Sequence, residues 1–219
     1  MEKKRILIYG DSNTHGFRVR DGLRYDRNHR WTGICQNLTA DFAEILEEGL
    51  NGRTTCCDEP GMEFRNGLTY IQPCIRTHLP LDLICVMVGT NDLKPVFGRT
   101  PAEIACGAAE ILKRARQVTE SKYPQSSCQY LLMSPIEAGE ALLTGPFAWE
   151  FEGRITIEKS KAFAELFAAQ AKMNSFLFFD AARYAAAGKD DGLHLDEMNH
   201  DRLGRAFAAW LREWAGCSD

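Results

Sequence analysis

Residues 6–13 read ILIYGDSN, an apolar run followed at once by glycine, aspartate, serine and asparagine. The run has no polar residue at every second position, which is typical of a strand buried on both faces of a parallel sheet. Three similar runs follow at residues 83–88, 130–133 and 176–179, and a weaker one lies at 42–46. Together these five runs predict the strands of one sheet.

Stretches with helical spacing lie between the runs. The clearest begins at Thr100-Pro101-Ala102-Glu103, where a capping hydroxyl, a proline at the first helical position and a glutamate at the third predict a helix start. The apolar residues that then share one helical face are Ile104, Ala108, Ile111, Ala115 and Val118. Apolar stripes within residues 31–38, 163–171 and 203–214 predict three further helices.

Alternation of strands and helices predicts the fold class. Parallel strands need crossover connections, and right-handed crossovers place helices on both faces of the sheet. We therefore expect a three-layer α/β/α sandwich with a mostly parallel five-stranded sheet. No internal repeat, low-complexity tract or linker divides the sequence, so residues 1–219 are predicted to form one domain. Ligands of such sheets bind at the carboxyl ends of the strands.

Composition narrows the class of protein further. Hydrophobic residues make up 45% and charged residues 26% of the 219 residues, which excludes disordered, collagen-like and disulfide-scaffold proteins. The net charge of −4 is spread along the chain, so neither nucleic acid nor a membrane surface is an expected partner. The apolar runs are too short to span a bilayer, and residues 1–10 lack the apolar region of a signal peptide. The expectation is a soluble cytoplasmic protein.

The eight cysteines form no metal-binding or redox motif of the CxxC type. They stand at positions 35, 56, 57, 74, 85, 106, 128 and 217, and most are expected to be small buried apolar residues. Cys56 and Cys57 are adjacent and could form a strained vicinal disulfide. Reduced thiols are favoured, because disulfides are rare in cytosolic proteins.

Polar segments follow the predicted strands and precede the last helix. They are Gly10-Asp11-Ser12-Asn13, Gly89-Thr90-Asn91-Asp92 and Asp191-Gly192-Leu193-His194. A serine hydroxyl becomes a strong nucleophile only when a base takes its proton and a third group orients that base. Asp191 and His194 can supply both groups from one turn, with the carboxylate on one ring nitrogen and the other nitrogen facing Ser12.

Attack by serine on a carbonyl also requires donors for the developing oxyanion. The side-chain amide of Asn91, the backbone N–H of Gly52 and the backbone N–H of Ser12 are the candidates. Alternatively, Asn91 is a turn cap and Gly52 a left-handed turn residue. The co-occurrence of both residues with Ser12 and His194 favours the oxyanion interpretation.

Four blocks, Gly10-Asp11-Ser12-Asn13, Asn51-Gly52, Gly89-Thr90-Asn91-Asp92 and Asp191-x-x-His194, resemble the signature blocks of the SGNH (GDSL) hydrolases. The resemblance implies a flavodoxin-like sandwich, with Ser12 as nucleophile and His194 as general base oriented by Asp191. It also implies that Ser12, Gly52 and Asn91 form the oxyanion hole, with no metal or cofactor.

Further segments resemble the arylesterase/acyltransferase branch of these hydrolases, whose enzymes hydrolyse small esters and transfer acyl groups. They include Arg30-Trp31-Thr32-Gly33 and residues 47–55, 80–83 and 89–94. The resemblance implies a serine esterase acting on a small-molecule ester through an acyl-enzyme. It also implies a homo-oligomer, in which an exposed Trp31 could serve an interface. Asn13 departs from the leucine usual in the family, and His15 and Phe17 stand where acyltransferase relatives carry tryptophans.

Several residues near these blocks are candidates for the substrate pocket: Asp11, Asn13, His15, Phe17, Phe151 and Leu193. His15 could be a rival base, but a role in the pocket wall or in solvent is favoured. Asp11 and Asp92 are expected to hold turns by accepting from backbone N–H groups. The aromatic stretch at 139–153, with Phe147, Trp149 and Phe151, is expected to form a loop over the site. His29, His78 and His200 lie in polar or helix-edge settings and receive no role.

Alternative functions stay open at this point. A carbohydrate acetylesterase or a thioesterase of the same fold would use the same residues. A metal-dependent hydrolase would use Asp11, Asp92, Asp191 and His194 as ligands for a hard cation. A non-catalytic flavodoxin-like module would bind a phosphate-bearing ligand at the strand ends, although the sequence has no GxGxxG or GxxxxGK[ST] loop.

Overall fold

A five-stranded parallel sheet forms the centre of the computed structural model, which describes residues 2–217. Its strands are β1 (Lys4–Gly10), β2 (Ala43–Gly49), β3 (Leu83–Met87), β4 (Gln129–Ser134) and β5 (Leu177–Asp180). They lie in the order β2-β1-β3-β4-β5, and every neighbouring pair is parallel. Each strand overlaps one of the five apolar runs, so the predicted sheet is confirmed.

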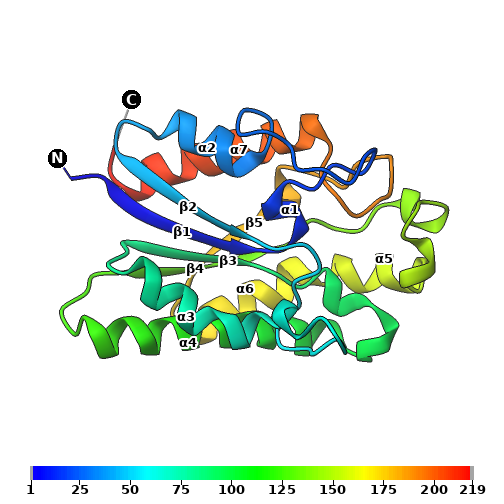
Figure 1. Ribbon diagram of the computed structural model, residues 1–219, viewed down its shortest axis with the longest axis horizontal. Coiled ribbons are helices and arrows are strands. Elements are labelled where there is room, and N and C mark those ends of the chain that lie inside the picture. Colours follow the sequence, from blue (N-terminus) through cyan, green and yellow to red (C-terminus); the bar gives the residue numbers. More distant parts are fainter. Residues whose placement is uncertain (1, 218–219) are drawn as a thin grey trace.

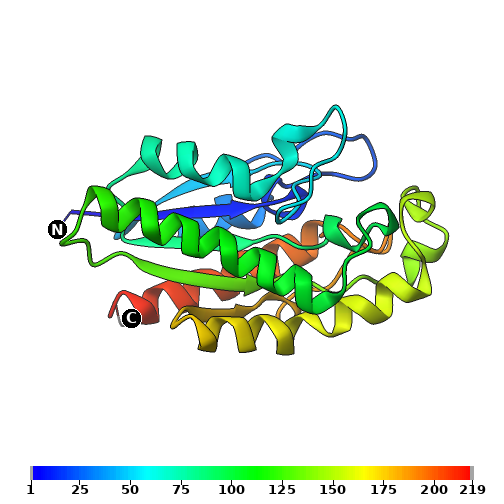
Figure 2. The ribbon, with the colours of Figure 1, turned by 90° about the horizontal axis from the view of Figure 1, so that it is seen from below.

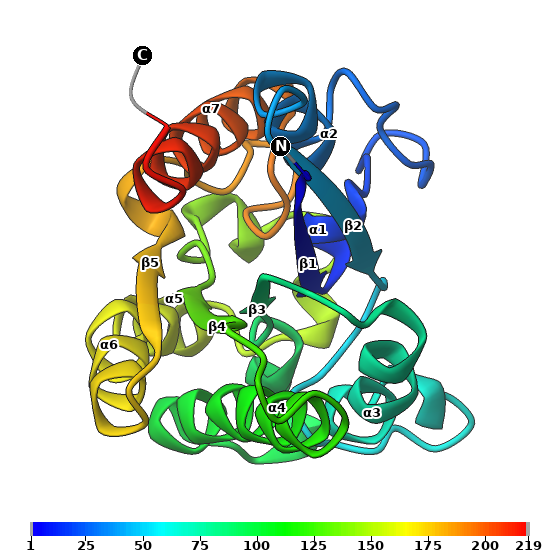
Figure 3. The ribbon, with the colours of Figure 1, turned by 90° about the vertical axis from the view of Figure 1, so that its left-hand side faces the viewer.

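Helices cover both faces of the sheet (Figure 1). Helices α2 (Trp31–Leu38) and α7 (Glu197–Trp214) lie on one face, and α3 (Gly67–His78), α4 (Pro101–Lys122) and α6 (Phe163–Met173) lie on the other. The end-on view in Figure 3 shows the three layers. Two short helices, α1 (Ser12–His15) and α5 (Arg154–Lys161), complete the fold. The α/β/α sandwich predicted from the alternation is confirmed.

Alternate residues of each strand enter separate cores on the two faces. Leu7 and Tyr9 of β1 pack with α3, α4 and α6, which lie across that face in Figure 2, whereas Ile6 and Ile8 pack with α2 and α7. All four side chains are fully buried. Burial on both faces explains why the strand sequences are apolar without alternation.

The local sequence predicts the start of helix α4 but does not predict helix α3. At the start of α4, Thr100 and Glu103 form the predicted capping box. Helix α3 escaped prediction because Pro73 lies inside it, and a proline ordinarily ends a helical pattern. The side chain of Asn66 caps α3 by accepting from the N–H groups of Leu68 and Thr69. Helix α5, largely polar, was also not predicted.

Trp31 is fully buried, so its expected role in an exposed interface is wrong. Its ring packs edge-on against Phe207 of α7 with centroids 5.6 Å apart, and its indole N–H donates to the carbonyl of Asn13 at 3.0 Å. Trp31 therefore ties α2 to α7 and to the segment after β1.

Two further expectations concern the state of the cysteines and the length of the apolar segments. All eight cysteines are free thiols, and four of them, Cys35, Cys57, Cys74 and Cys85, are buried, while Cys106 is exposed. Over residues 2–217, the helices are all too short or too polar to cross a membrane.

His200 lies at the start of α7 and is fully buried, which corrects its expected polar or helix-edge setting. Its Nδ1 accepts from the backbone N–H of Trp31 at 3.3 Å, and its Nε2 has no hydrogen-bond partner among the described residues. Burial lowers the pKa of His200 to about 3, although Asp196 opposes the shift. The imidazole is therefore neutral in the folded protein at neutral pH.

This histidine predicts a component of acid sensitivity. In the unfolded chain a histidine binds a proton below about pH 6.5, whereas folded His200 does so only near pH 3. The free energy of unfolding should thus fall by about 1.4 kcal/mol for each pH unit between these limits because of this group. His200→Asn keeps an acceptor near the Trp31 N–H and lacks the titration. Urea unfolding should show the wild-type stability, relative to the variant, falling by about 1.4 kcal/mol between pH 5.5 and 4.5. A constant difference would contradict the assignment.

Candidate active site

Ser12 stands directly after β1, at the first position of α1, where the carboxyl ends of the parallel strands meet. The side chain of Asp11 caps this short helix by accepting from the N–H of Asn13 at 3.0 Å. Burial raises the pKa of Asp11 to about 6, although the Asn13 N–H opposes the shift. Asp11 therefore has the turn-holding role expected of it.

A hydrogen-bonded chain joins Ser12 to His194 and Asp191. The Ser12 hydroxyl lies 2.9 Å from His194 Nε2, and His194 Nδ1 lies 2.5 Å from Asp191 Oδ2. The other carboxylate oxygen of Asp191 accepts from the N–H groups of Leu193 and His194, both at 2.9 Å. The predicted juxtaposition of serine, imidazole and carboxylate is thus present.

Asp191 is fully buried, yet its surroundings favour the ionised carboxylate. Burial alone raises the pKa of its carboxyl, but the hydrogen bond and charge of His194 and the two N–H donors outweigh that effect. The pKa of Asp191 consequently lies below its usual value. An ionised Asp191 fixes the His194 tautomer that leaves Nε2 free to accept a proton from Ser12.

Asn13 holds the turn that carries His194. Its side-chain amide donates to the carbonyl of Leu193 at 3.1 Å, and its carbonyl accepts from the N–H of Leu195 at 2.8 Å. Asn13 is itself buried. These two bonds connect the segment after β1 directly to both sides of His194, a positioning role that the sequence did not reveal.

The stretch before α5 supports the same turn from the other side. Gly139 donates its N–H to the carbonyl of Gly192 at 2.8 Å. Gly192 has a φ of 70°, and a β-carbon there would lie 2.4 Å from the backbone nitrogen of Leu142. Only glycine suits both the left-handed backbone and this close approach.

Gly52 and Asn91 reach the site from the ends of β2 and β3. Gly52 has a φ of 77°, so its predicted left-handed turn is present. The Asn91 side chain donates one N–H to the carbonyl of Arg53 at 3.1 Å, which leaves its second N–H for a ligand. Within residues 2–217, the N–H groups of Ser12 and Gly52 have no protein acceptor. Three donors are therefore unused beside the Ser12 hydroxyl.

Arg53 fixes the turn that carries Gly52. Its guanidinium is buried, donates to the carbonyls of Gly10 (2.8 Å) and Glu48, and lies over the ring of Tyr9, 3.8 Å from the centroid. Together these contacts hold the Gly52 turn against the end of β1, next to Ser12.

Asp92 connects the same turn to the segment that carries Asn91. Its buried carboxyl accepts from the backbone N–H and the hydroxyl of Thr55, at 2.9 and 2.5 Å. Burial raises the pKa of Asp92 to about 6, despite these donors. Asp92 accepts from a backbone N–H as expected, but that N–H belongs to Thr55 in a neighbouring loop and not to the turn of Asp92 itself.

A cavity of about 400 Å³ opens at Ser12. One part of its wall is aromatic, and the rings of Phe17 and Phe147 lie 4.7 and 5.5 Å from the His194 ring, between centroids. Another part is polar and charged. It includes Asn51, Thr90, and the ion pairs Arg65–Glu59 and Lys94–Glu150. The exposed ring of Trp149 forms part of the rim.

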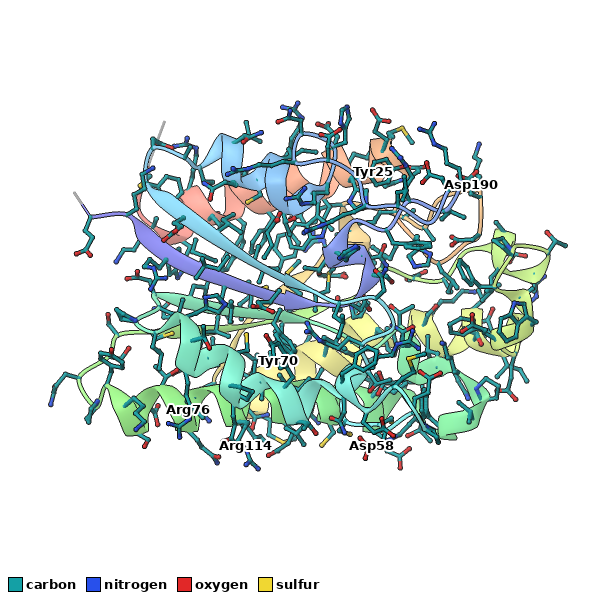
Figure 4. All side chains as sticks on the ribbon, viewed as in Figure 1. Tyr25, Asp58, Tyr70, Arg76, Arg114 and Asp190 are labelled. Atoms are coloured by element: carbon teal, nitrogen blue, oxygen red, sulfur yellow. The ribbon has the colours of Figure 1, made fainter. Side chains whose placement is uncertain are left out.

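The predicted pocket residues divide into two groups. Phe17, Phe151 and Leu193 line the cavity, as do Phe147 and Trp149 from the predicted aromatic loop. Asp11, Asn13 and His15, also predicted for the pocket, are not among the residues that line this cavity. Asp11 and Asn13 are instead committed to the backbone bonds described above. Asp190, which directly precedes the Asp191–His194 turn, lies at the upper right edge of the molecule in Figure 4.

Residues that could hold a metal do not coincide with this cavity. Asp11, Asp92, Asp191 and His194 are not among the described residues whose ligand atoms gather closely enough to hold one ion. Among residues 2–217, only the ligand atoms of Glu48, Cys74 and His78 form a group, all within 4.8 Å of one another. The Glu48 carboxylate there already pairs with His78 Nε2 at 2.9 Å. The gathering of ligands expected for a metal-dependent hydrolase at Ser12 is therefore not observed.

Comparison with known proteins places the chain among ester hydrolases. A family model described as the GDSL-like Lipase/Acylhydrolase family matches residues 8–203. No curated protein sequence matches the chain.

Solved structures resemble the chain over almost its whole length. An aryl esterase from M. smegmatis shares 37% identity with a TM-score of 0.86, covering 96% of this chain and 99% of its own. Est24, a carbohydrate acetylesterase from Sinorhizobium meliloti, shares 34% with a TM-score of 0.87, covering 97% and 100%. A putative arylesterase from Agrobacterium tumefaciens shares 36% with a TM-score of 0.82, covering 96% and 99%.

Proposed function

The chain belongs to the GDSL-like lipase/acylhydrolase family, and we propose that it hydrolyses small carboxylic esters through an acyl-enzyme on Ser12. That it is an ester-hydrolysing enzyme follows from the family and from its esterase neighbours. The observation that carries the mechanism is the bond of 2.9 Å between the Ser12 hydroxyl and His194 Nε2. Without that bond, Ser12 would have no base within reach to take its proton.

In the first step, His194 Nε2 takes the proton of Ser12 as the hydroxyl oxygen attacks the ester carbonyl. Asp191, buried and bonded to Nδ1, stabilises the imidazolium that forms. The imidazolium then returns its proton to the alcohol that leaves, and the acyl group remains on Ser12.

Negative charge on the carbonyl oxygen is stabilised by the unused donors at the strand ends. These are the N–H groups of Ser12 and Gly52 and the second N–H of Asn91. Arg53 and Asp92 hold the two turns in place before substrate binds, so little reorganisation accompanies the reaction. This arrangement supports Asn91 and Gly52 as oxyanion donors.

In the second step, His194 activates a water molecule, which releases the acid and restores the Ser12 hydroxyl. Phe17 and Phe147 flank His194 and limit the approach of bulk water to it. An alcohol bound in the cavity can take the place of water, so transfer of the acyl group to alcohols is part of the proposal.

The cavity favours a short acyl group and a leaving group that is partly polar. Its volume of about 400 Å³ suits a small molecule, and its lining includes both aromatic side chains and two ion pairs. The aromatic wall suits an aryl ester. The hydrogen-bonding wall favours an acetylated sugar as a second candidate, the substrate class named for the S. meliloti relative.

Replacement of the nucleophile tests the mechanism. Ser12→Ala removes the atom that forms the covalent bond, so kcat for p-nitrophenyl acetate should fall by about 10⁴-fold or more. The exposed residue Ser121 on α4 offers a matched control, and Ser121→Ala should retain wild-type turnover. Similar circular dichroism spectra would verify that both variants fold. Turnover by Ser12→Ala near the wild-type rate would rule out the proposed nucleophile.

Asn91→Ala tests the oxyanion assignment separately. Loss of one oxyanion donor should lower kcat by about 10²–10³-fold, with a smaller change in KM, since the donor acts mainly in the transition state. Steady-state kinetics with the same ester measure both constants. If kcat changes less than about threefold in a folded variant, Asn91 only holds its turn, through Arg53.

A further inference from the structure

Cys56 and Cys57 lie on the loop from β2 to α3, beyond the cavity that contains Ser12. Cys56 is partly exposed, and its sulfur accepts a hydrogen bond from Arg99 Nη2 at 2.9 Å. Arg99 precedes α4 and forms no salt bridge with any carboxylate among residues 2–217. The Cys56 sulfur is thus a direct hydrogen-bond partner of the Arg99 guanidinium.

The two neighbouring sulfurs have different environments. A hydrogen bond from Cys57, then the Thr55 hydroxyl and the Arg99 charge, lower the pKa of the Cys56 thiol. The same bond, burial and the Asp92 charge raise the pKa of Cys57. Cys57 Sγ lies 3.7 Å from Asp92 Oδ1. Cys56, beside Arg99, is therefore the sulfur that more readily forms a thiolate, and Cys57 is the one that more readily keeps its proton.

Other cysteines lack this combination. Burial raises the pKa of Cys35, Cys74 and Cys85, which suits inert core residues. Cys106, on α4, is exposed and forms no hydrogen bond through its sulfur within the described chain. Exposure without a cationic partner makes Cys106 an internal reference for ordinary thiol reactivity.

We propose that Cys56 is a covalent modification site, a nucleophilic thiolate that hydroperoxides oxidise and that Cys57 then captures as a vicinal disulfide. The thiolate attacks the outer oxygen of the hydroperoxide, the O–O bond breaks, and the departing alkoxide takes a proton from water. Cys56 becomes a sulfenic acid. The hydroxide left by that transfer takes the proton of Cys57, whose sulfur attacks the Cys56 sulfur, and the hydroxide displaced from Cys56 takes a proton from the solvent. The net change converts a thiolate, a thiol, one hydroperoxide and one proton from the solvent into a disulfide, an alcohol and water.

The reagent can reach this site, and the product is readily reversed. Asp58, the exposed residue that follows the pair, lies at the outer surface of the molecule in Figure 4. Consecutive Cα atoms are about 3.8 Å apart, closer than the roughly 4.4–6.8 Å of ordinary disulfides. A disulfide between adjacent cysteines is therefore strained and easily reduced by a small thiol.

Peptide mapping of the wild-type protein tests the proposal. Reduced protein is treated with cumene hydroperoxide at pH 6.5, the remaining thiols are alkylated, and tryptic peptides are analysed by mass spectrometry. A loss of 2 Da should appear in the peptide of residues 54–65 before Cys106 in the peptide of residues 100–113 is oxidised, and dithiothreitol should reverse it. Oxidation of Cys106 as fast as, or faster than, that of Cys56 would overturn the proposal.

Two variants separate the steps. In Cys57→Ser the capturing thiol is missing, so dimedone should add to Cys56 as a sulfenic acid. Arg99→Gln removes the cation and should bring the rate of Cys56 alkylation at pH 6.5 down toward that of Cys106, from about tenfold above it. Absence of the dimedone adduct in folded Cys57→Ser, or an unchanged alkylation rate in Arg99→Gln, would contradict the mechanism.

Discussion

The hydrogen bond between the Ser12 hydroxyl and His194 Nε2 joins two segments from nearly opposite ends of the chain. It exists because a parallel sheet brings every strand's carboxyl end to the same edge. Ser12 follows β1 there, and the His194 turn is brought to the same edge by the two bonds of Asn13. The proposed chemistry thus depends on the contact between Ser12 and His194. The sheet topology allows this contact, and the buried amide of Asn13 positions the His194 turn for it.

The remaining machinery is fixed before any substrate arrives. Arg53 holds the Gly52 turn against β1, and Asp92 holds that loop against the segment of Asn91. Arg53 does this by donating to two backbone carbonyls, and Asp92 by accepting from the N–H and the hydroxyl of Thr55. Such preorganisation is the usual source of rate enhancement in ester hydrolysis, and the family and structural neighbours agree with that chemistry.

Features that depend on local sequence could be predicted, whereas those that depend on distant contacts could not. Buried strands and the Thr100 capping box have local signatures, and the polar residues after the strands follow from topology. Helix α3 was missed because its proline contradicts the local pattern. Asn13 was assigned to the pocket, since its partners lie 180 and 182 residues away. Trp31, part of an apolar stripe, was also considered for an interface, because its packing partner Phe207 lies far from it in the sequence.

The central claim is that the hydroxyl oxygen of Ser12 forms the covalent intermediate. Active-site labelling tests this claim most directly. The protein is treated with a fluorophosphonate, which reacts with serines activated by a general base, and the labelled tryptic peptide is sequenced by mass spectrometry. The account predicts one phosphonyl group per chain, on Ser12 in the peptide of residues 6–18, with loss of activity in proportion to labelling. Inactivation with the label on another residue would contradict it.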